Sequence, residues 1–326
     1  MYDVIVVGSA TRDVFLRADG FELREHADSP TGKEQCFPYG TKLEIKQITF
    51  TSGGGGCNAV VTFGRQGFKS AFVGVIGEDM EGEEVLRELK SENVDTQFCR
   101  KDGDDHTAYS TILVYPDGER TILSYKGEGH HFDVNKMPID QFEAKWLFLD
   151  SLGGHYDLFE ALVNHGVKKG IKIASNPGGK ELDHGLEKLK PLLKHIDIFG
   201  VNAEEGAGLV GTKPEEQHET IKKLSEVCGG IVILTDGHNG VKVLADGILY
   251  TAGVPDSPVI ERTGAGDAFH SGFLSEYIRS GDIKKAIQFG TANSSSVVTK
   301  DGSKAGILKE GDWGPWPLVE VKEEKF

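Results

Sequence analysis

A glycine-rich turn that ends in an acid, Thr263-Gly264-Ala265-Gly266-Asp267, directly precedes an amphipathic run that predicts a helix over 267–280. A glycine turn that opens a helix aims backbone N–H groups at one point, and the helix dipole makes that point attractive to anions. An aspartate there would repel phosphate, unless it takes a proton from a hydroxyl group that then attacks the phosphate. The segment therefore predicts a phosphoryl-transfer site.

A second glycine cluster, Ser52-Gly53-Gly54-Gly55-Gly56-Cys57-Asn58, precedes another predicted helix. Glycines let a ligand approach the backbone closely, and an asparagine offers both a hydrogen-bond donor and an acceptor. Gly53, Gly54 and Asn58 are therefore candidate binding residues. A hinge or a tight turn would have the same composition, so this alternative stays open.

Asp13 lies just beyond the first predicted strand, where open α/β sheets bind their ligands. There it could accept hydrogen bonds from two adjacent hydroxyl groups, although a turn or a helix cap also explains an aspartate. Asp150, which follows a predicted strand at 146–149, is a further candidate at the same edge.

Two later strand ends carry polar residues of a different kind. Asn202 and Glu205 are three residues apart, so they share one face of the helix that begins here. A carboxylate and an amide suit Mg²⁺ that is held mostly through water, and a helix cap is the alternative. The segment Thr235-Asp236-Gly237-His238-Asn239-Gly240 could surround a nucleotide, or it is an ordinary β-turn.

The elements that must position these residues alternate along most of the chain. Apolar β-branched runs predict buried strands, and amphipathic runs between them predict helices, among them 157–169, 181–194 and 283–298. This order predicts a single α/β domain over 1–326, a doubly wound, mostly parallel sheet with helices on both faces. Two segments, about 12–52 and 107–125, have the period-two pattern of antiparallel strands instead, over 42–50 for example. We expect them to form a small sheet that covers the site as a lid.

Composition limits the partners. The 326 residues carry a net charge of −15 and the sequence contains no basic run, so nucleic acid and anionic membranes are not expected partners. An acidic protein that binds a nucleoside triphosphate needs a divalent cation between the like charges. Four widely spaced cysteines, no signal-peptide pattern and no membrane-spanning segment predict a cytoplasmic protein.

Taken in order, these motifs resemble those of the ribokinase-like, PfkB-type carbohydrate kinases over essentially the whole chain. The most specific are the glycine cluster with the downstream Gly64-Arg65-Gln66-Gly67, and Thr263–Phe269. The resemblance implies an ATP- and Mg²⁺-dependent kinase that phosphorylates a hydroxymethyl group of a small sugar.

The resemblance also implies a role for each candidate residue. Asp267 would be the catalytic base, and the N–H groups of Gly264, Ala265 and Gly266 would form an anion hole. Asp13, Gly53, Gly54 and Asn58 would hold the sugar. Asn202 and Glu205 would act on Mg²⁺ and phosphates. The residues that would line the ATP site are Thr235, Gly237, Gly240 and Asn293.

Some positions depart from the family pattern. Glu261-Arg262 stands where Asp-Thr is usual, and Gly306 replaces a hydroxyl in the late loop of about 299–306, so the K⁺ that many members bind is in question. Gly55 stands where ribokinases often have lysine. A nucleoside such as adenosine is therefore the alternative acceptor, with Phe15, Phe50, Tyr109 and Tyr125 as aromatic candidates for the base. An inactive binding protein on the same fold is a further alternative. Family lids often pair, so a homodimer through the lid is expected.

Overall fold

The computed structural model describes residues 1–29, 31–115 and 119–326. In these residues ten strands form one large sheet in the order β18-β17-β16-β15-β14-β13-β12-β1-β6-β8. The strands from β15 to β8 in this order run parallel, and β16, β17 and β18 are antiparallel to their neighbours. The strands span Tyr2–Val7 (β1), Ser70–Val73 (β6), Val94–Asp95 (β8), Ala144–Leu149 (β12), Lys172–Ser175 (β13), Ile198–Asn202 (β14), Ile231–Thr235 (β15), Val241–Ala245 (β16), Ile248–Ala252 (β17) and Val321–Lys325 (β18).

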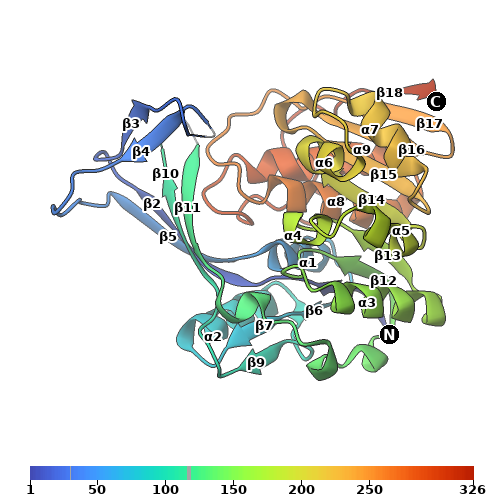
Figure 1. Ribbon diagram of the computed structural model, residues 1–326, viewed down its shortest axis with the longest axis horizontal. Helices are drawn as coiled ribbons and strands as arrows, with labels where there is room; N and C mark the ends of the chain where they lie inside the picture. Colours follow the sequence, from blue (N-terminus) through green and yellow to red (C-terminus); the bar gives the residue numbers. More distant parts are fainter. Residues whose placement is uncertain (30, 116–118) are drawn as a thin grey trace.

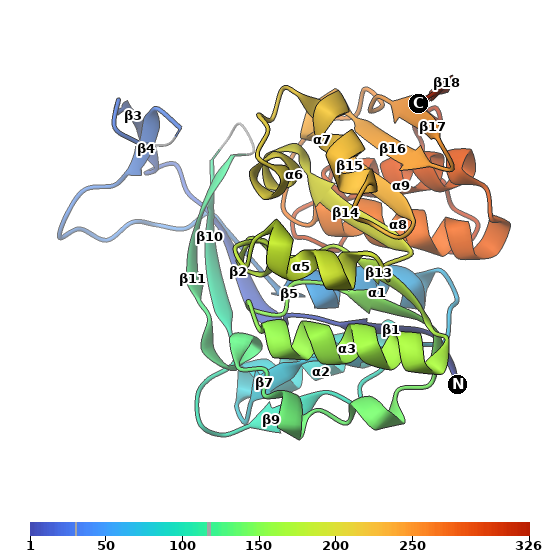
Figure 2. The same cartoon turned by 45° about the vertical axis from the view of Figure 1, so that its right-hand side comes forward.

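Helices cover both faces of this sheet (Figures 1 and 2). The helices are α1 (Gly55–Arg65), α2 (Met80–Ser91), α3 (Tyr156–Lys169), α4 (Gly179–Leu182), α5 (Leu186–Leu193), α6 (Ala203–Val210), α7 (Gln217–Ser225), α8 (Ala265–Ser280) and α9 (Ile283–Val297). Strand β1 shows why both faces need cover. Its Ile5 and Val7 join the apolar layer under α3, α5 and α7, whereas Val4 and Val6 join the layer under α1, α2, α8 and α9. Successive side chains of a strand point to opposite faces, so an unbroken apolar run is buried on both.

A second, four-stranded sheet projects from one side of the molecule (Figure 1). Its order is β11-β10-β2-β5, with β2 (Thr11–Arg17), β5 (Gln47–Gly53), β10 (Tyr109–Val114) and β11 (Arg120–Tyr125). We call it the lid sheet. Two short pairs complete the strands, β3 (Glu22–Glu25) with β4 (Lys33–Cys36) and β7 (Val75–Gly77) with β9 (Arg100–Asp102). The predicted fold class, a mostly parallel sheet with helices and a small extra sheet, is confirmed.

Three local expectations differ from the structure. The strand expected over 42–50 begins at Gln47, because its ladder with β2 ends where Gln47 pairs with Arg17. The helix expected over 181–194 is divided into α4 and α5, and Gly185 between them has a φ of +81° that no continuous helix contains. The β3–β4 hairpin was not predicted. In the described part of the chain, no helix has the length and apolar character needed to cross a membrane.

Candidate active site

The carboxyl ends of the parallel strands bring the predicted residues to one edge of the large sheet. Gly8 follows β1, Asp150 follows β12, and β14 and β15 end at Asn202 and Thr235. The first two are packed together, since a Cβ atom at Gly8 would lie 2.8 Å from Cβ of Asp150. This edge is where a doubly wound sheet offers a crevice for ligands.

The glycine loop between β5 and α1 lies directly against Asp13 of β2. A Cβ atom at Gly53 would be 1.8 Å from Oδ2 of Asp13, so only glycine leaves the carboxylate its place. Gly54 has a φ of +87°, which also favours glycine. Asp13 is buried and accepts a hydrogen bond from Oγ1 of Thr11 at 2.7 Å. Burial raises the pKa of the Asp13 carboxyl, and the Thr11 hydrogen bond and the Lys304 charge oppose that rise.

The turn before α8 has the geometry that its sequence predicts. Gly264 caps the helix with a φ of +81°, and Ala265, Gly266 and Asp267 form the first helical turn, where N–H groups lack acceptors within the helix. The amide of Ala265 does have one neighbour, the Arg262 carbonyl at 3.3 Å. The structure brings Asp267 and Asn58 together, because Nδ2 of Asn58 donates to Oδ2 of Asp267 at 2.8 Å.

Asp267 lies in an environment that disfavours its charge. Burial raises the pKa of its carboxyl, and the negative charge of Asp13 adds to the rise, while the Asn58 hydrogen bond and the Lys304 ammonium lower it. A base whose pKa rises towards the working pH accepts a proton more readily.

Asp150 is a third carboxylate at this edge, and it is buried. Its pKa is raised well above the ordinary value by burial and by the charge of Asp267. Oδ1 accepts the Ser151 amide at 2.7 Å, and Oδ2 is buried without a hydrogen-bond partner among the described residues. Gly55 makes room for this carboxylate, since a Cβ atom there would lie 1.9 Å from Oδ1. The glycine that replaces the lysine of ribokinases thus has a packing reason.

A cavity of about 90 Å³ lies behind the first turn of α8. Thr235, Gly237 and Gly240 line it from one side, and Ala265 and Gly266 from the other. Gly240 has a φ of +94°, and a Cβ atom there would lie 2.1 Å from the Ala252 carbonyl oxygen. The residues that the sequence predicts for a nucleotide therefore adjoin the predicted anion hole.

Asn293 does not line this cavity. Its side chain is buried on another face of α9, where Nδ2 donates to the Ala268 carbonyl at 2.8 Å and Oδ1 accepts the Leu308 amide at 2.9 Å. The neighbouring Thr291 and Ser294 line the cavity instead. The hydroxyl of Thr291 is buried with no hydrogen-bond partner in the described residues, which suits a contact with a ligand.

Asn202 and Glu205 form a reciprocal cap at the start of α6. Oδ1 of Asn202 accepts the Glu205 amide at 2.8 Å, and Oε2 of Glu205 accepts the Asn202 amide at 3.0 Å. The structure therefore contains the helix cap that the sequence left open as an alternative. This cap uses only one of the two carboxylate oxygens of Glu205. Burial raises the pKa of Glu205, and the charges of Asp267 and Glu204 add to the rise.

Comparisons with known proteins show the family of this chain. Residues 1–310 match the pfkB family carbohydrate kinase family. The chain belongs to this family. A nucleoside kinase of Methanothermobacter thermautotrophicus is 24% identical over 97% of the chain and 98% of its own length, and a ribokinase of Haemophilus influenzae is 28% identical over 83% and 90%. The solved structure of Arabidopsis thaliana ribokinase with ribose and ATP superposes with a TM-score of 0.76 at 20% identity, covering 94% of this chain and 96% of that one. The predicted enzyme class, an ATP-dependent carbohydrate kinase, is confirmed.

Glu261 is a position at which this chain departs from the pfkB-type pattern, and the structure shows what surrounds it. Glu261 is 1% exposed, and its Oε1 accepts the Thr263 amide at 2.5 Å and lies 3.8 Å from Nε of Arg120. Oε2 has no hydrogen-bond partner among the described residues. One carboxylate oxygen is thus free for a cation, but the guanidinium of Arg120 already supplies the positive charge. These residues fit an additional monovalent cation poorly.

Three functional candidates of this pfkB-type site were missed in the sequence. Ser303 and Lys304 come from the loop after α9, and Glu88 comes from α2; all three contact the glycine loop or Asn58. No local pattern marks them. The burial of Lys304 marks it in the structure, since lysine is almost never fully buried unless paired, but the sequence does not show burial.

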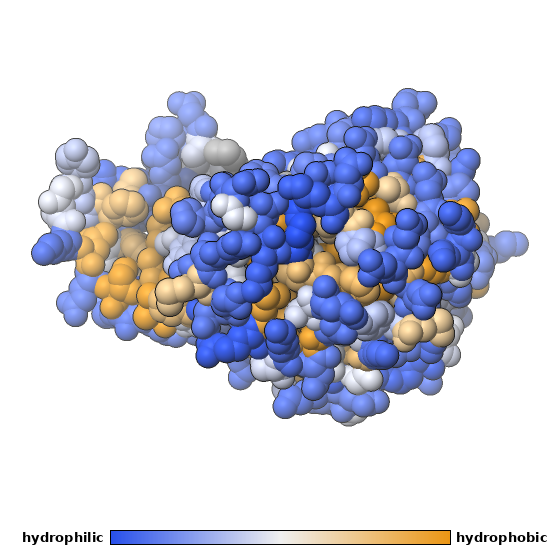
Figure 3. Space-filling model, turned by 90° about the horizontal axis from the view of Figure 1, so that it is seen from below, coloured by the Kyte–Doolittle hydropathy of each residue, from blue (hydrophilic) through white to orange (hydrophobic). Residues whose placement is uncertain are grey.

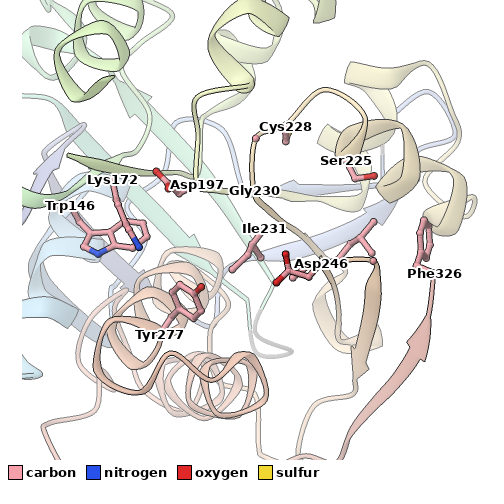
Figure 4. Close-up of a pocket in the computed structure, with 14 residues that line it drawn as sticks. Trp146, Lys172, Asp197, Ser225, Cys228, Gly230, Ile231, Asp246, Tyr277 and Phe326 are labelled. Carbon is pink, nitrogen blue, oxygen red and sulfur yellow. The ribbon is translucent and has the colours of Figure 1, made fainter. Parts of the chain in front are cut away.

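A larger cavity, of about 530 Å³, lies at the opposite end of the large sheet (Figure 4). Trp146, Lys172, Asp197 and Ile231 line it at or near the amino ends of β12 to β15. It contains none of the predicted site residues. Since α/β sheets bind their ligands at the carboxyl ends of the strands, the smaller cavity is the candidate active site of this pfkB-family kinase.

Proposed function

We propose that this protein transfers the γ-phosphoryl group of ATP to a hydroxymethyl group of a small, uncharged sugar, with Asp267 as the base. One observation carries this proposal. The half-buried Asp267 follows directly on the glycine turn, so its carboxylate faces Asn58 and Asp13 while the amides of the turn adjoin the cavity of Thr235 and Gly237.

The proposed reaction needs little more than this arrangement. Asp267 accepts the proton of the acceptor hydroxyl, the oxygen forms a bond to the γ-phosphorus, and the bond from that phosphorus to the β–γ bridging oxygen breaks to release ADP. The N–H groups of Gly264, Ala265 and Gly266 stabilise the charge that grows on the transferred group. Positioning and electrostatics supply nearly all of the acceleration in such transfers.

Mg²⁺ belongs to the proposal as the partner of ATP. The described residues contain no cluster of three or more acidic, His or Cys side chains that could hold a metal alone. Glu205 is nevertheless a carboxylate in a region with surplus negative charge, together with Asp150 and Asp267. These residues suit an ion held mainly by phosphates and water, with Glu205 and Asn202 on its protein side. When bound, Mg²⁺ neutralises phosphate charge.

The charges of the acceptor side favour an uncharged acceptor. Asp13 and Asp150 are buried there, Asp267 is half-buried, and Lys304 is already bound to Ser52 and Glu88. Carboxylates accept hydrogen bonds from vicinal hydroxyl groups, but they repel a phosphate group. A sugar that already carries phosphate is therefore a poor candidate.

A nucleoside is the second candidate, and Phe15 is the observation that favours it. Of the four lid aromatics, Phe15 shares the face of Asp13 and approaches Gly302, whereas Phe50, Tyr109 and Tyr125 share the register of the opposite face. A buried phenyl ring on the site face could cover a base as well as a sugar ring. The nucleoside kinase relative covers the chain nearly end to end.

An ADP-release assay with ATP·Mg²⁺ tests these candidates. The acceptors are ribose, fructose, 2-keto-3-deoxygluconate, adenosine, inosine and cytidine, with ribose 1-phosphate and fructose 6-phosphate as charged counterparts. We expect turnover with an uncharged sugar and none with either phosphate. Turnover with a nucleoside alone would select the second candidate. Tight binding of an acceptor without any turnover would indicate an inactive binding protein.

The lid sheet is also the proposed contact with a second copy of the chain. On the face opposite Asp13, the edge strands expose Ile48 and Phe50 of β5 and Leu123 and Tyr125 of β11, each about half exposed. Figure 3 shows hydrophobic residues gathered on the projecting end of the molecule. Exposed apolar edge strands favour pairing. We further propose a cytoplasmic location, which suits the four free cysteines and the need for ATP.

A further inference from the structure

The loop that follows α9 sends two consecutive side chains into the centre of the site. Ser303 is fully buried and Lys304 is 2% exposed. Neither has a part in the proposed reaction. Burying an ammonium group is costly unless partners compensate for the lost water, so its partners indicate what it does.

Lys304 holds the start of the glycine loop. Its Nζ donates to the Ser52 carbonyl and, at 2.7 Å, to the Ser52 hydroxyl, and it lies 3.2 Å from Oε1 of Glu88. The Ser52 amide donates to Oε2 of the same glutamate at 2.6 Å. Burial raises the pKa of Glu88, but the Lys304 charge and the Ser52 amide outweigh burial and lower it. A charged pair thus fastens the residue next to Gly53 to α2.

Ser303 braces the opposite side of the site. Its hydroxyl donates to Oδ1 of Asn58 at 2.9 Å, and Nδ2 of the same amide donates to Asp267. A Cβ atom at Gly264 would lie 2.5 Å from the Ser303 carbonyl oxygen, so the loop also packs on the anion-hole turn. The loop therefore contacts both the residue proposed to hold the acceptor, Asn58, and the turn proposed to stabilise the transferred phosphoryl group.

The groups around the ammonium are almost all acidic. Glu88 from α2, Asp13 from β2, Asp267 from α8 and the Cys57 thiol from α1 all interact with its charge. Asp150 and Glu205 add negative charge around Asp267. The pKa values of Asp13 and Asp267 are raised by burial, and Lys304 is the cation that opposes this rise at both.

We propose that Lys304 is a positioning residue for phosphoryl transfer: its ammonium fixes the start of the glycine loop and is the buried positive charge that faces both Asp13 and Asp267. This inference rests on the proposed role of Asp267 as the base. It gives the positive charge of the site to a lysine from the late loop, in a chain whose glycine loop has Gly55 in place of lysine.

The test is the pH dependence of kcat/KM, from about pH 5.5 to about pH 9, with the acceptor that turns over fastest in the panel. Without the ammonium, Asp267 holds its proton to higher pH, so the acidic limb of Lys304→Met should move to higher pH. The loss of activity should be larger at pH 6 than at pH 8, with the KM for ATP unchanged. Lys304→Arg keeps the charge and should restore the limb. Lys300→Met, an exposed lysine of the same loop, is the matched control.

Glu88→Gln provides the opposite sign. It leaves the ammonium in place without its charged partner, so the positive charge that favours ionised Asp267 is no longer offset by Glu88, and the acidic limb should move to lower pH. This variant also keeps the test decisive if Lys304→Met fails to fold. A uniform loss at every pH, with no movement of the limb in folded variants, would overturn the inference alone. Wild-type protein that turns over no acceptor would overturn the proposed function, and this inference with it.

Discussion

Nε of Arg120, at the start of β11, lies 3.8 Å from Oε1 of Glu261, three residues before the glycine turn of α8. A second pair crosses the first, because Arg262 contacts Glu119 of the same hairpin. The two pairs join the tip of the lid sheet to the segment that leads into the anion hole. Glu261 and Arg262, at which this chain leaves its family pattern, therefore both contact the lid sheet.

This relationship predicts that the enzyme does not need K⁺. Replacing KCl by NaCl should leave turnover of the wild-type protein unchanged. Arg120→Ala removes the counter-charge of a buried carboxylate, so kcat should fall about tenfold and K⁺ should restore part of the loss. Arg24→Ala, which removes an exposed arginine of β3 paired with Glu22, is the control. A wild-type requirement for K⁺ would contradict this account of Glu261.

Removing the proposed base should separate chemistry from binding. Asp267→Asn keeps the shape of the side chain but cannot accept the proton, so kcat should fall by about 10²–10⁴-fold while ATP binding, measured by calorimetry, stays near the wild-type value. Asp256→Asn, in an exposed loop, should have no effect on either quantity. Near-normal turnover of Asp267→Asn would assign the base elsewhere.

Asp150 should lower the stability of the folded protein as well as hold the substrate. Its folded-state pKa is raised by burial and by Asp267, so the folded chain binds a proton more tightly than the unfolded chain. The contribution of Asp150 to stability therefore declines as pH rises from the ordinary carboxyl pKa through the folded value. Asp150→Asn should raise the free energy of unfolding more at pH 8 than at pH 5, by about 1 kcal/mol as measured by thermal denaturation, and it should raise the acceptor KM. An equal change at both pH values would refute the electrostatic explanation.

Pairing through the lid sheet predicts a change in mass. Phe50→Glu places a charge on the exposed apolar face and should convert a dimer into a monomer, as measured by light scattering after gel filtration. Tyr39→Glu, at a fully exposed aromatic outside the lid sheet, should leave the mass as it is. A wild-type monomer would show that this face has another role.

The sequence-based predictions were accurate where the residues that carry the signal are close together in the chain. The start of α8 was predictable because its glycine, its acid and its amphipathic run are consecutive residues, and the φ of Gly264 follows from them. The sequence predicted Asn293 at the ATP site, but the structure does not bring its side chain to the cavity. Helix α9 is polar on more than one face, so its composition does not show which face meets the ligand. Lys304 could not be found at all, since its partners Ser52 and Glu88 are more than two hundred residues away in the chain.

That separation has a consequence for how the enzyme becomes active. Ser303 bonds to a side chain 245 residues earlier, and Lys304 to one 252 residues earlier. Contacts between such distant segments close the largest loops and form late in folding. During synthesis, the residues of the lid sheet, the glycine loop and α8 leave the ribosome before the late loop. The growing chain should therefore acquire its fold first and its catalytic competence last, with the docking of a few residues near 303.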